Sequence, residues 1–457
     1  MIGLSSIVTR TILPFSRDRR PAPVTPDTAR QPRDPALVGR EMWTLLAELY
    51  PICRSITGDG VRATLRGLQP HVPLRIHEVP SGTPIFDWAV PNEWNIRDAY
   101  VKNSSGKRVI DFQESNLHVV SYSVPVRRRM TLAELKRHLF TLPERPDWIP
   151  NRTSYYEESW GFCLRHSRFV ELEDGQYDVC IDSSLAPGSL SYGEYYVEGA
   201  STEEVLFSAH VCHPSLCNDN LSGIVVAAFL AKHLPPPPRR YSYRFLFAPA
   251  TIGALTWLHL NESRLSRIRH GLVFTCLGDA GGHTYKRSRR GDAEIDRAVE
   301  VTLRDQGTPH RIVPFSPSGY DERQFCSPGF NLPIGCLMRS PQYPEYHTSA
   351  DDLDLVQPDA LGASLATCLG VIDVLENDRR YMNQSPYGEP QLGRRGLYQT
   401  RDERDRTASE LNAIKWVLNL SDGKHSLLDI AERSGSQFGL VKLATAALLE
   451  CGLLKEA

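Results

Sequence analysis

The sequence predicts an α/β fold, and three features of the 457-residue chain support that class. First, short apolar runs and helical patterns alternate from about 148 to 376, as they do when helices cover a sheet. Second, the clearest strands, at 204–208, 243–248 and 271–276, are apolar and rich in β-branched and aromatic residues. Third, turns with polar residues follow these strands, and open α/β sheets bind ligands at that edge.

Apolar residues at helical spacing predict the helices of this domain. A first helix is expected at 35–50, and a second at 61–68 after the turn-forming segment 54–60. The later helices are expected at 224–233, 253–260, 293–306 and 361–377. Together with the strands they give the alternation that an α/β domain requires.

The segment 74–147 has a different pattern from the rest of the domain. Short β-branched and aromatic runs alternate there with turn signals, such as Asn-Ser-Ser-Gly at 103–106. We therefore expect an inserted, mostly β subdomain at 74–147. The α/β domain is then built from 36–73 and 148–380.

The two ends of the chain differ from the α/β domain. Residues 1–35 are rich in Arg and Pro and poor in apolar residues, which predicts a disordered tail. The polar segment 381–406 is expected to be a linker. After it, helical segments at 411–418, 426–434 and 440–451 predict a winged-helix or helix-turn-helix module at 407–457. Ser426 stands three residues before Asp429, which resembles a capping box.

Charge and composition limit the expected partners. From Ser409 on, five Lys and Arg face six Asp and Glu, so the C-terminal module lacks a basic face and is expected to dock a protein rather than nucleic acid. The whole chain has a formal net charge of −2, which attracts neither nucleic acid nor a membrane surface. Ten cysteines without a CxxC pair suggest reduced thiols in a cytoplasmic protein.

The most informative stretch is Ser-Ala-His-Val-Cys-His-Pro-Ser-Leu-Cys-Asn-Asp-Asn-Leu-Ser-Gly at 208–223. It presents His210, His213 and Asp219 between a predicted strand and a predicted helix. Imidazole nitrogen and carboxylate oxygen are the ligands that catalytic zinc prefers. Three further polar segments are expected at the same sheet edge, at 248–253, 277–282 and 320–325, the last followed by 343–352.

The order of these motifs resembles the two-zinc aminopeptidases. The order is a histidine, then Asp-Asn-x-Ser-Gly at 219–223, Asp-x-Gly at 279–281 and His-Thr-x-x-Asp at 347–351. Closer still, His-Val-Cys-His-Pro at 210–214, Asp-Glu-Arg-Gln at 321–324 and Glu-Tyr-His-Thr-Ser at 345–349 resemble a bacterial aminopeptidase-like family.

The resemblance covers roughly 40–457 and implies a fold class: a mixed sheet flanked by helices, with an inserted mostly-β subdomain and a C-terminal winged-helix domain. Many members of that family lie near polysaccharide or natural-product biosynthesis genes. The motifs are specific for the family and much less specific for a substrate.

The resemblance also implies metal ligands. His210 matches the first metal histidine, Asp219 the aspartate that bridges two zinc ions, Asp279 the carboxylate of the first site and His347 the histidine of the second.

The chain departs from the two-zinc pattern at one place. Those enzymes carry a Glu-Glu pair, a base and a metal ligand, where this chain has Pro-Ala-Thr at 249–251. The protein is therefore a mononuclear enzyme with a base from elsewhere, a dinuclear enzyme with a replacement ligand such as His213, or a fold without peptidase chemistry. One zinc ion is expected, with two as the alternative.

A substitute general base is expected on a loop near His347. Glu322 is the first candidate and Glu345 the second. The alternative for Glu322 is an ion pair with a neighbouring cation. The alternative for His213 is that it hydrogen-bonds to a metal ligand and does not itself coordinate the metal.

Four further residues are expected to bind the substrate. Arg323 and Arg339 can each hold a carboxylate by two parallel hydrogen bonds, or else pair within the protein. Tyr320 and Tyr346 stand beside the Asp-Glu-Arg-Gln segment and His347.

The sequence therefore predicts a zinc-dependent hydrolase that cleaves an amide bond in a small peptide or aminoacyl conjugate within a biosynthetic pathway. The alternative is a catalytically altered aminopeptidase-like binding or scaffold protein in polysaccharide or natural-product biosynthesis. A protein partner for the winged helix and a homodimer are further expectations.

Overall fold

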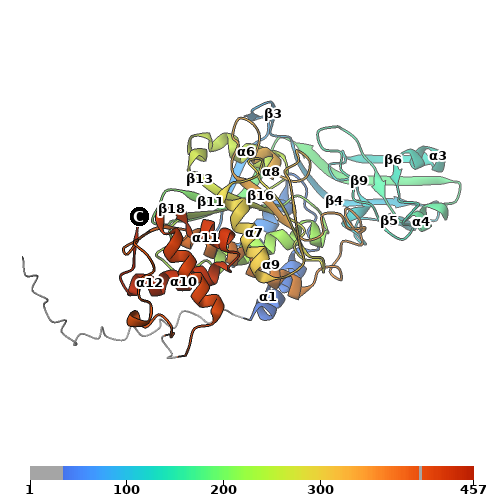
Figure 1. The fold of residues 1–457 in the computed structure, drawn as a ribbon. Helices are drawn as coiled ribbons and strands as arrows, with labels where there is room; N and C mark the ends of the chain where they lie inside the picture. The colour runs from blue at the N-terminus through green and yellow to red at the C-terminus, as the bar shows by residue number, and fades with distance from the viewer. Residues whose placement is uncertain (1–33, 401–403) are drawn as a thin grey trace, which may run out of the picture. The chain divides into compact units, whose positions relative to one another are not determined.

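An eight-stranded sheet lies at the centre of the structure, a computed structural model that describes residues 34–400 and 404–457. The sheet belongs to the compact unit that runs from Pro35 to Ala457, and Figure 1 labels its strands β11, β13 and β16. In spatial order the strands are β1 (Arg75–Pro80), β10 (Ser189–Val197), β12 (Ser242–Ala248), β11 (Glu204–His210), β13 (Ile268–Phe274), β16 (Ile334–Met338), β14 (His283–Lys286) and β15 (His310–Val313). The predicted tail lies outside the described residues, apart from its last two positions.

The sheet is mixed, which confirms the predicted fold class. The central strands β12, β11, β13 and β16 run parallel, whereas β1, β10 and β14 pair antiparallel with their neighbours towards the centre. All seven residues of β11 and all seven of β12 are buried. Such strands read as continuous apolar runs because helices cover both of their faces.

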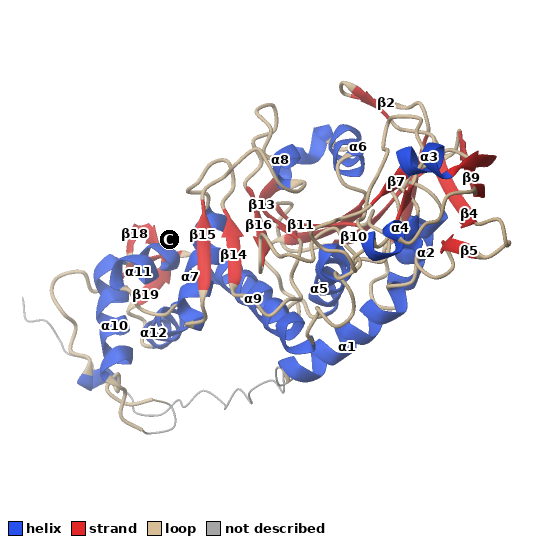
Figure 2. Ribbon diagram, turned by 90° about the vertical axis from the view of Figure 1, so that its right-hand side faces the viewer, coloured by secondary structure: helices blue, strands red, loops and turns tan. Residues whose placement is uncertain are grey.

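Two helical layers cover the sheet, as Figure 2 shows. One layer holds α1 (Pro35–Leu49), α2 (Asp59–Leu68), α5 (Gly223–Lys232), α7 (Glu294–Gln306) and α9 (Pro358–Asn377). The other holds α6 (Ile252–Leu260) and the short α8 (Glu322–Phe325). Alternate residues of β11 enter the two cores: Val205 and Phe207 join the first, and Leu206 joins the second. The predicted helices are present, with ends shifted by up to three residues.

A second, antiparallel sheet forms the inserted subdomain, in the order β5 (Arg108–Asp111), β4 (Glu93–Lys102), β9 (Gln176–Ala186) and β6 (Val126–Thr131). Its own core includes Val101, Leu135 and Ile181. These limits differ from the expected 74–147. The strand β1 belongs to the large sheet, and β9 lies beyond residue 147. Alternating patterns predict strands, but they do not tell which distant strand each one pairs with.

Several short elements lie between or beside the strands of the two sheets. The short strands are the hairpin β2 (Pro84–Ile85) and β3 (Trp88–Ala89) and the pair β7 (Leu139–Phe140) and β8 (Phe162–Cys163). The short helices are α3 (Leu132–Leu135), α4 (His166–Val170) and the 3₁₀ helices η1 (Asn116–His118), η2 (Lys136–His138) and η4 (Glu262–Arg267).

The C-terminal module is a winged helix, as predicted. It contains α10 (Ala408–Leu420), β18 (Asp422–Ser426), α11 (Leu427–Ser434), α12 (Phe438–Glu450) and β19 (Leu454–Glu456). Ser426 and Asp429 form the expected capping box at the start of α11. The module begins earlier than 407, because β17 (Arg380–Asn383) pairs with β18 and β19. Thus the start of the predicted linker is a strand, and its other described residues, 384–400 and 404–406, contain the turn η5 (Gly393–Arg395) and an isolated bridge between Gln399 and Asp405.

Ion pairs fix the winged helix to the α/β domain. Arg297 on α7 contacts Asp429 and Glu432 on α11 at 2.6 and 2.5 Å, and Lys442 on α12 contacts Asp373 on α9 at 2.6 Å. Beside them, the carboxyl groups of Glu294 and Asp378 interact directly. Burial raises the pKa of both groups; the neighbouring Asp378 raises that of Glu294 further, whereas the hydrogen bond with Glu294 opposes the rise for Asp378.

Helix α9 is long and apolar enough to cross a membrane by length and composition alone. It packs against α1, α5 and α7, and most of its apolar window is buried. A core helix of a large domain has the same properties, so α9 is explained by its packing.

The raised pKa values of Glu294 and Asp378 predict a pH-dependent stability. The folded state keeps protons that the unfolded state releases above about pH 4.3, so these carboxyls destabilise the fold increasingly as the pH rises above that value. We expect Glu294→Gln to raise the melting temperature at pH 8 and to leave it unchanged near pH 4. Glu389→Gln, which removes an exposed carboxylate, is the matched control. An equal shift of Glu294→Gln at both pH values would contradict this account.

Candidate metal centre

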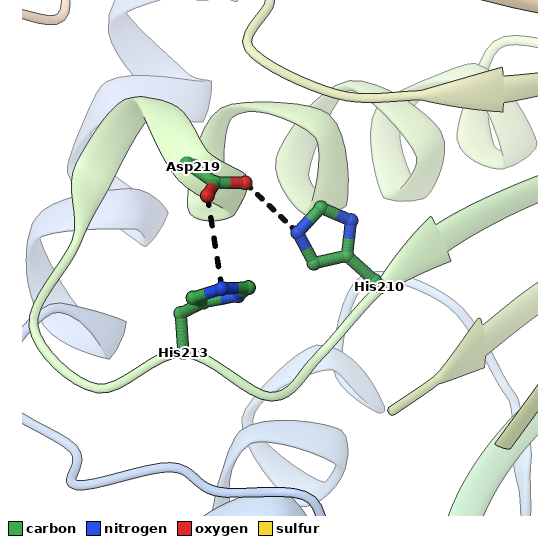
Figure 3. Close-up of side chains that lie close together, drawn as sticks. All are labelled: His210, His213 and Asp219. Carbon is green, nitrogen blue, oxygen red and sulfur yellow. Dashed lines mark hydrogen bonds and ion pairs between the residues drawn. The ribbon is translucent and has the colours of Figure 1, made fainter. Parts of the chain in front are cut away.

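Two histidines and an aspartate meet at the carboxyl end of β11. His210 is the last residue of β11, His213 lies three residues further, and Asp219 lies in the turn η3 (Cys217–Ser222) that leads into α5. Figure 3 shows both rings facing the Asp219 carboxylate. His210 Nε2 lies 2.9 Å from Asp219 Oδ1, and His213 Nε2 lies 3.7 Å from Oδ2. The ligand atoms all lie within 4.8 Å of one another.

A third imidazole, from a distant part of the sequence, also contacts Asp219. His347 follows β16, and its Nε2 lies 2.9 Å from Asp219 Oδ2. Its ring centroid is 5.0 Å from that of His213. The carboxylate of Asp219 is therefore contacted by imidazoles on both oxygens, the arrangement that the resemblance implied for His210, Asp219 and His347.

The protonation of these groups suits metal binding. Burial lowers the pKa of His213 to about 3, so its ring is neutral and can offer a nitrogen lone pair. Burial alone would raise the pKa of Asp219, but the surrounding imidazoles hold it well below its usual range. A carboxylate and neutral imidazoles are a zinc ligand set, and a span of 4.8 Å is close to what metal–ligand distances of about 2.0–2.2 Å can bridge.

Asp351 holds the turn that carries Asp219. Its carboxylate accepts hydrogen bonds from the backbone N–H of Asn218 at 2.5 Å and of Asp219 at 3.0 Å. Tyr343 OH donates to the same group at 2.9 Å. Burial raises the pKa of Asp351 to about 7. Asp351 thus positions the backbone of the metal turn, a role that its place near His347 in the sequence did not reveal.

A buried guanidinium holds the other loop of the site. Arg54 donates to the carbonyl oxygens of His213 at 2.7 Å and Pro214 at 3.0 Å, and also to Leu49 O and Thr64 Oγ1. In the sequence, Arg54 is notable only as the start of the turn-forming segment 54–60. Burial lowers the pKa of Arg54 to about 10, and its donors reach three backbone carbonyls and the Thr64 hydroxyl.

Asp279 lies outside the histidine cluster, in contrast to the role implied by the resemblance. Its carboxylate accepts hydrogen bonds from Asn218 Nδ2 at 3.0 Å, Ser340 Oγ at 2.6 Å and Gly281 N at 2.8 Å. Closer to the end of β13, the thiol of Cys276 hydrogen-bonds with Tyr320 OH at 3.3 Å. Asp279 lies five residues beyond the end of β13, and there its carboxylate belongs to a network of protein donors.

The three histidines line a cavity of about 760 Å³, whereas Asp219 is fully buried and is not part of the lining. Aromatic and polar side chains share the lining: Trp88, Tyr155, Tyr156, His210, Cys212, His213, Ala250, Thr251, Ile252, Leu255, Gly319, Tyr320, Asp321, Arg323, Gln324, Pro341, Gln342, Tyr343, Tyr346 and His347. Ala250 and Thr251 occupy the place of the Glu-Glu pair, so that side of the cavity has no carboxylate.

The carboxylate that reaches the cavity is Asp321, one residue before the expected base. Its Oδ1 is buried without a hydrogen-bond partner. Burial raises the pKa of Asp321 to about 7, and the neighbouring His210 opposes that rise. In contrast, Glu322 is fully buried, is absent from the lining and forms an ion pair with Lys286. Asp321 and Glu322 are adjacent at the start of α8, and their side chains point in different directions. The order of residues in the sequence does not predict which of the two faces the cavity.

The other predicted site residues divide between the cavity and its surroundings. Tyr320, Arg323 and Tyr346 line it, and Tyr346 stacks on His347 with ring centroids 4.0 Å apart. Glu345 and Arg339 do not line it. The Arg339 guanidinium instead donates to Ala360 O and Ser364 Oγ at 3.4 Å.

The fold and the site define an aminopeptidase-like α/β protein with an appended winged helix. The chain belongs to the family described as "Domain of unknown function (DUF4910)", whose model matches residues 43–378. A winged helix-turn-helix family matches residues 379–456, in agreement with the position of β17. The family resemblance inferred from the motifs is thereby confirmed.

Two relatives from Clostridium acetobutylicum are similar over nearly the whole chain. One, described as a candidate polysaccharide biosynthesis protein with an aminopeptidase-like domain, is 55% identical over 418 residues, 91% of this chain and 96% of the relative. The other is a crystal structure of a candidate peptidase, 54% identical, with a TM-score of 0.89 over 93% of this chain and 97% of that chain.

The zinc aminopeptidase BSAP from Bacillus subtilis shares the fold. It is 11% identical, with a TM-score of 0.54 over 73% of this chain and 94% of that chain.

The geometry makes opposite predictions for two aspartates. Replacing a residue that only orients a ligand costs about 10–100-fold in metal affinity, so removing the central carboxylate by Asp219→Asn should weaken zinc binding by more than about 100-fold. Asp279→Asn should keep zinc, because Asp279 is already bound by protein donors. Zinc content after dialysis and calorimetric titration of both folded variants measure the difference. Zinc retained by Asp219→Asn but lost by Asp279→Asn would show that the site is built around Asp279 instead.

Proposed function

We propose that the protein is a zinc-dependent hydrolase that cleaves an amide bond in a small substrate. The observation that carries the proposal is the buried Asp219 carboxylate, contacted by three imidazoles in the wall of a cavity that a small molecule can enter. His210, His213, His347 and Asp219 would hold the ion. Catalytic zinc sites typically use three such ligands and leave the fourth position to water or substrate, so these four residues offer one donor more than such a site needs.

A bound zinc ion supplies a Lewis acid that polarises a carbonyl group and lowers the pKa of water to about 7. The remaining work falls to side chains of this chain. Asp321 faces the same cavity as His210 and has a free, buried oxygen, so it is placed to accept the proton of the attacking water. The same group, once protonated, can deliver the proton to the leaving nitrogen.

The cavity suits a small molecule rather than a polypeptide. Its volume of about 760 Å³ is typical of pockets for small ligands. Trp88, Tyr155 and Tyr156 form an aromatic wall that can pack against a ring or an apolar chain. The name of the 55% identical relative supports a place in polysaccharide biosynthesis, where amide bonds link acyl groups or amino acids to sugars.

The second candidate is a binding or scaffold protein with this fold and no hydrolytic activity. The observation that favours it is the Ala250-Thr251 pair, which leaves one side of the cavity without a carboxylate. In that case Asp219 and the histidines would bind a metal for structural reasons, and Asp321 would have no catalytic effect.

Two adjacent variants separate catalysis from folding. Asp321→Asn should lower kcat by about 10² to 10⁴ while the zinc content stays the same, because loss of a general base removes about that factor. Glu322→Gln should leave kcat of the folded enzyme almost unchanged. It should reduce the free energy of unfolding by about 3–5 kcal/mol, because Lys286 then lacks its buried partner. Steady-state kinetics on a panel of aminoacyl anilides, N-acyl amino sugars and dipeptides, with denaturant unfolding, measure both effects.

The opposite pattern would exclude Asp321 as the base: a large loss of kcat in Glu322→Gln and none in Asp321→Asn. Absence of turnover of the whole panel by zinc-loaded wild-type protein would favour the scaffold alternative.

A further inference from the structure

Arg323 is the only lysine or arginine in the described lining of the cavity. It lies on α8, two residues after Asp321, and its guanidinium NH2 donates to Thr251 Oγ1 at 3.3 Å. Thr251 stands directly before α6, on the side of the cavity where the two-zinc enzymes carry their Glu-Glu pair. A cation therefore reaches the cavity on the side where those enzymes carry carboxylates.

Most hydrogen-bond donors of Arg323 have no acceptor among the described residues. A guanidinium carries five N–H donors. Among the described residues, Arg323 makes the one hydrogen bond to Thr251, forms no ion pair, and has a buried Nε without a partner. A buried N–H without an acceptor is unfavourable, so the group is satisfied only when another acceptor arrives.

The two arginines that are almost fully buried in the described part of the chain, Arg54 and Arg244, each have several partners. Arg244 contacts Glu194 at 2.7 Å and Glu204 at 2.6 Å, and Arg54 donates to four acceptors. Arg339 and Arg406 also have a buried Nε without a partner, but neither of them lines the cavity. Arg323 is different because its open donors belong to a side chain in the cavity wall.

We propose that Arg323 binds an anionic group of the substrate, so that the cavity selects amides that carry a carboxylate. This inference rests on the proposed hydrolase function and specifies its substrate class. The planar fork of the guanidinium matches a carboxylate through two parallel hydrogen bonds. The carbon skeleton between the carboxylate and the scissile amide packs against the aromatic wall. With a divalent ion bound, the charged groups of the cavity have a positive sum, which also favours an anionic substrate.

Hydroxamates test this inference, because they bind zinc through one end and carry a variable group at the other. The probes are the monohydroxamates of succinic, glutaric and adipic acid, each paired with the neutral hydroxamate of the same chain length. Calorimetry on the full-length, zinc-loaded protein measures affinity without any need for turnover. We expect at least one acid to bind about 10–100-fold more tightly than its neutral partner, the gain of a charge-assisted contact.

Variants assign that preference to Arg323. Arg323→Gln should abolish the preference for the acid and leave the affinity of the neutral probe unchanged, and Arg323→Lys should retain part of it. Arg339→Gln, which removes a cation outside the cavity, is the matched control and should keep the full preference. Circular dichroism verifies that each variant is folded.

The outcomes separate this inference from the function on which it rests. Equal binding of acids and neutral partners by the wild-type protein would overturn the role of Arg323 while leaving the zinc hydrolase intact. A preference that persists in Arg323→Gln would overturn it as well. No binding of any hydroxamate to zinc-loaded protein would contradict the zinc site itself.

Discussion

A carboxylate with no exposed surface, that of Asp219, is the constraint on which the site depends. A buried anion is costly unless groups around it compensate the charge, and among the described residues no lysine or arginine pairs with it. Imidazoles from two separate loops surround it instead. Two further buried side chains fix those loops: Asp351 accepts backbone N–H groups of the turn that carries Asp219, and Arg54 donates to the carbonyls of His213 and Pro214. The proposed zinc ion would complete this arrangement.

Other residues of the site can take over the tasks of the missing Glu-Glu pair in the proposed hydrolysis. Ala250 and Thr251 remove a base and a ligand from one side of the cavity, but His213 adds an imidazole beside Asp219, and Asp321 brings a carboxyl to the cavity from α8. Arg323 contacts Thr251 and so places a positive charge on the side of the cavity where the two-zinc enzymes carry the Glu-Glu pair. These changes alter the charge of the cavity in one direction: a site with fewer acids and one added cation suits an anionic substrate better than a cationic one.

Apolar runs and turn residues are local signals, and they predicted the α/β class, the main helices and the C-terminal helical module. The mixed sheet and the grouping of His210, Asp219 and His347 were implied by the resemblance to the two-zinc aminopeptidases. The sequence did not predict the limits of the inserted sheet, since the partner of β9 is β4, about 80 residues earlier. Nor did it separate Asp321 from Glu322. Both lie at the start of α8, and side-chain direction decides which one reaches the cavity. Asp279 was placed by analogy with a motif, whereas Ser340 and Asn218 occupy its oxygens.

X-ray absorption spectroscopy at the zinc edge tests the central claim most directly. Zinc-loaded, full-length protein should retain the ion after dialysis and show only nitrogen and oxygen neighbours at about 2.0–2.2 Å, with the outer-shell scattering of several imidazole rings. Three buried thiols, those of Cys212, Cys217 and Cys276, lie close to this part of the chain. A sulfur neighbour at about 2.3 Å, or a protein that loses all zinc on dialysis, would contradict a centre built on Asp219 and its histidines.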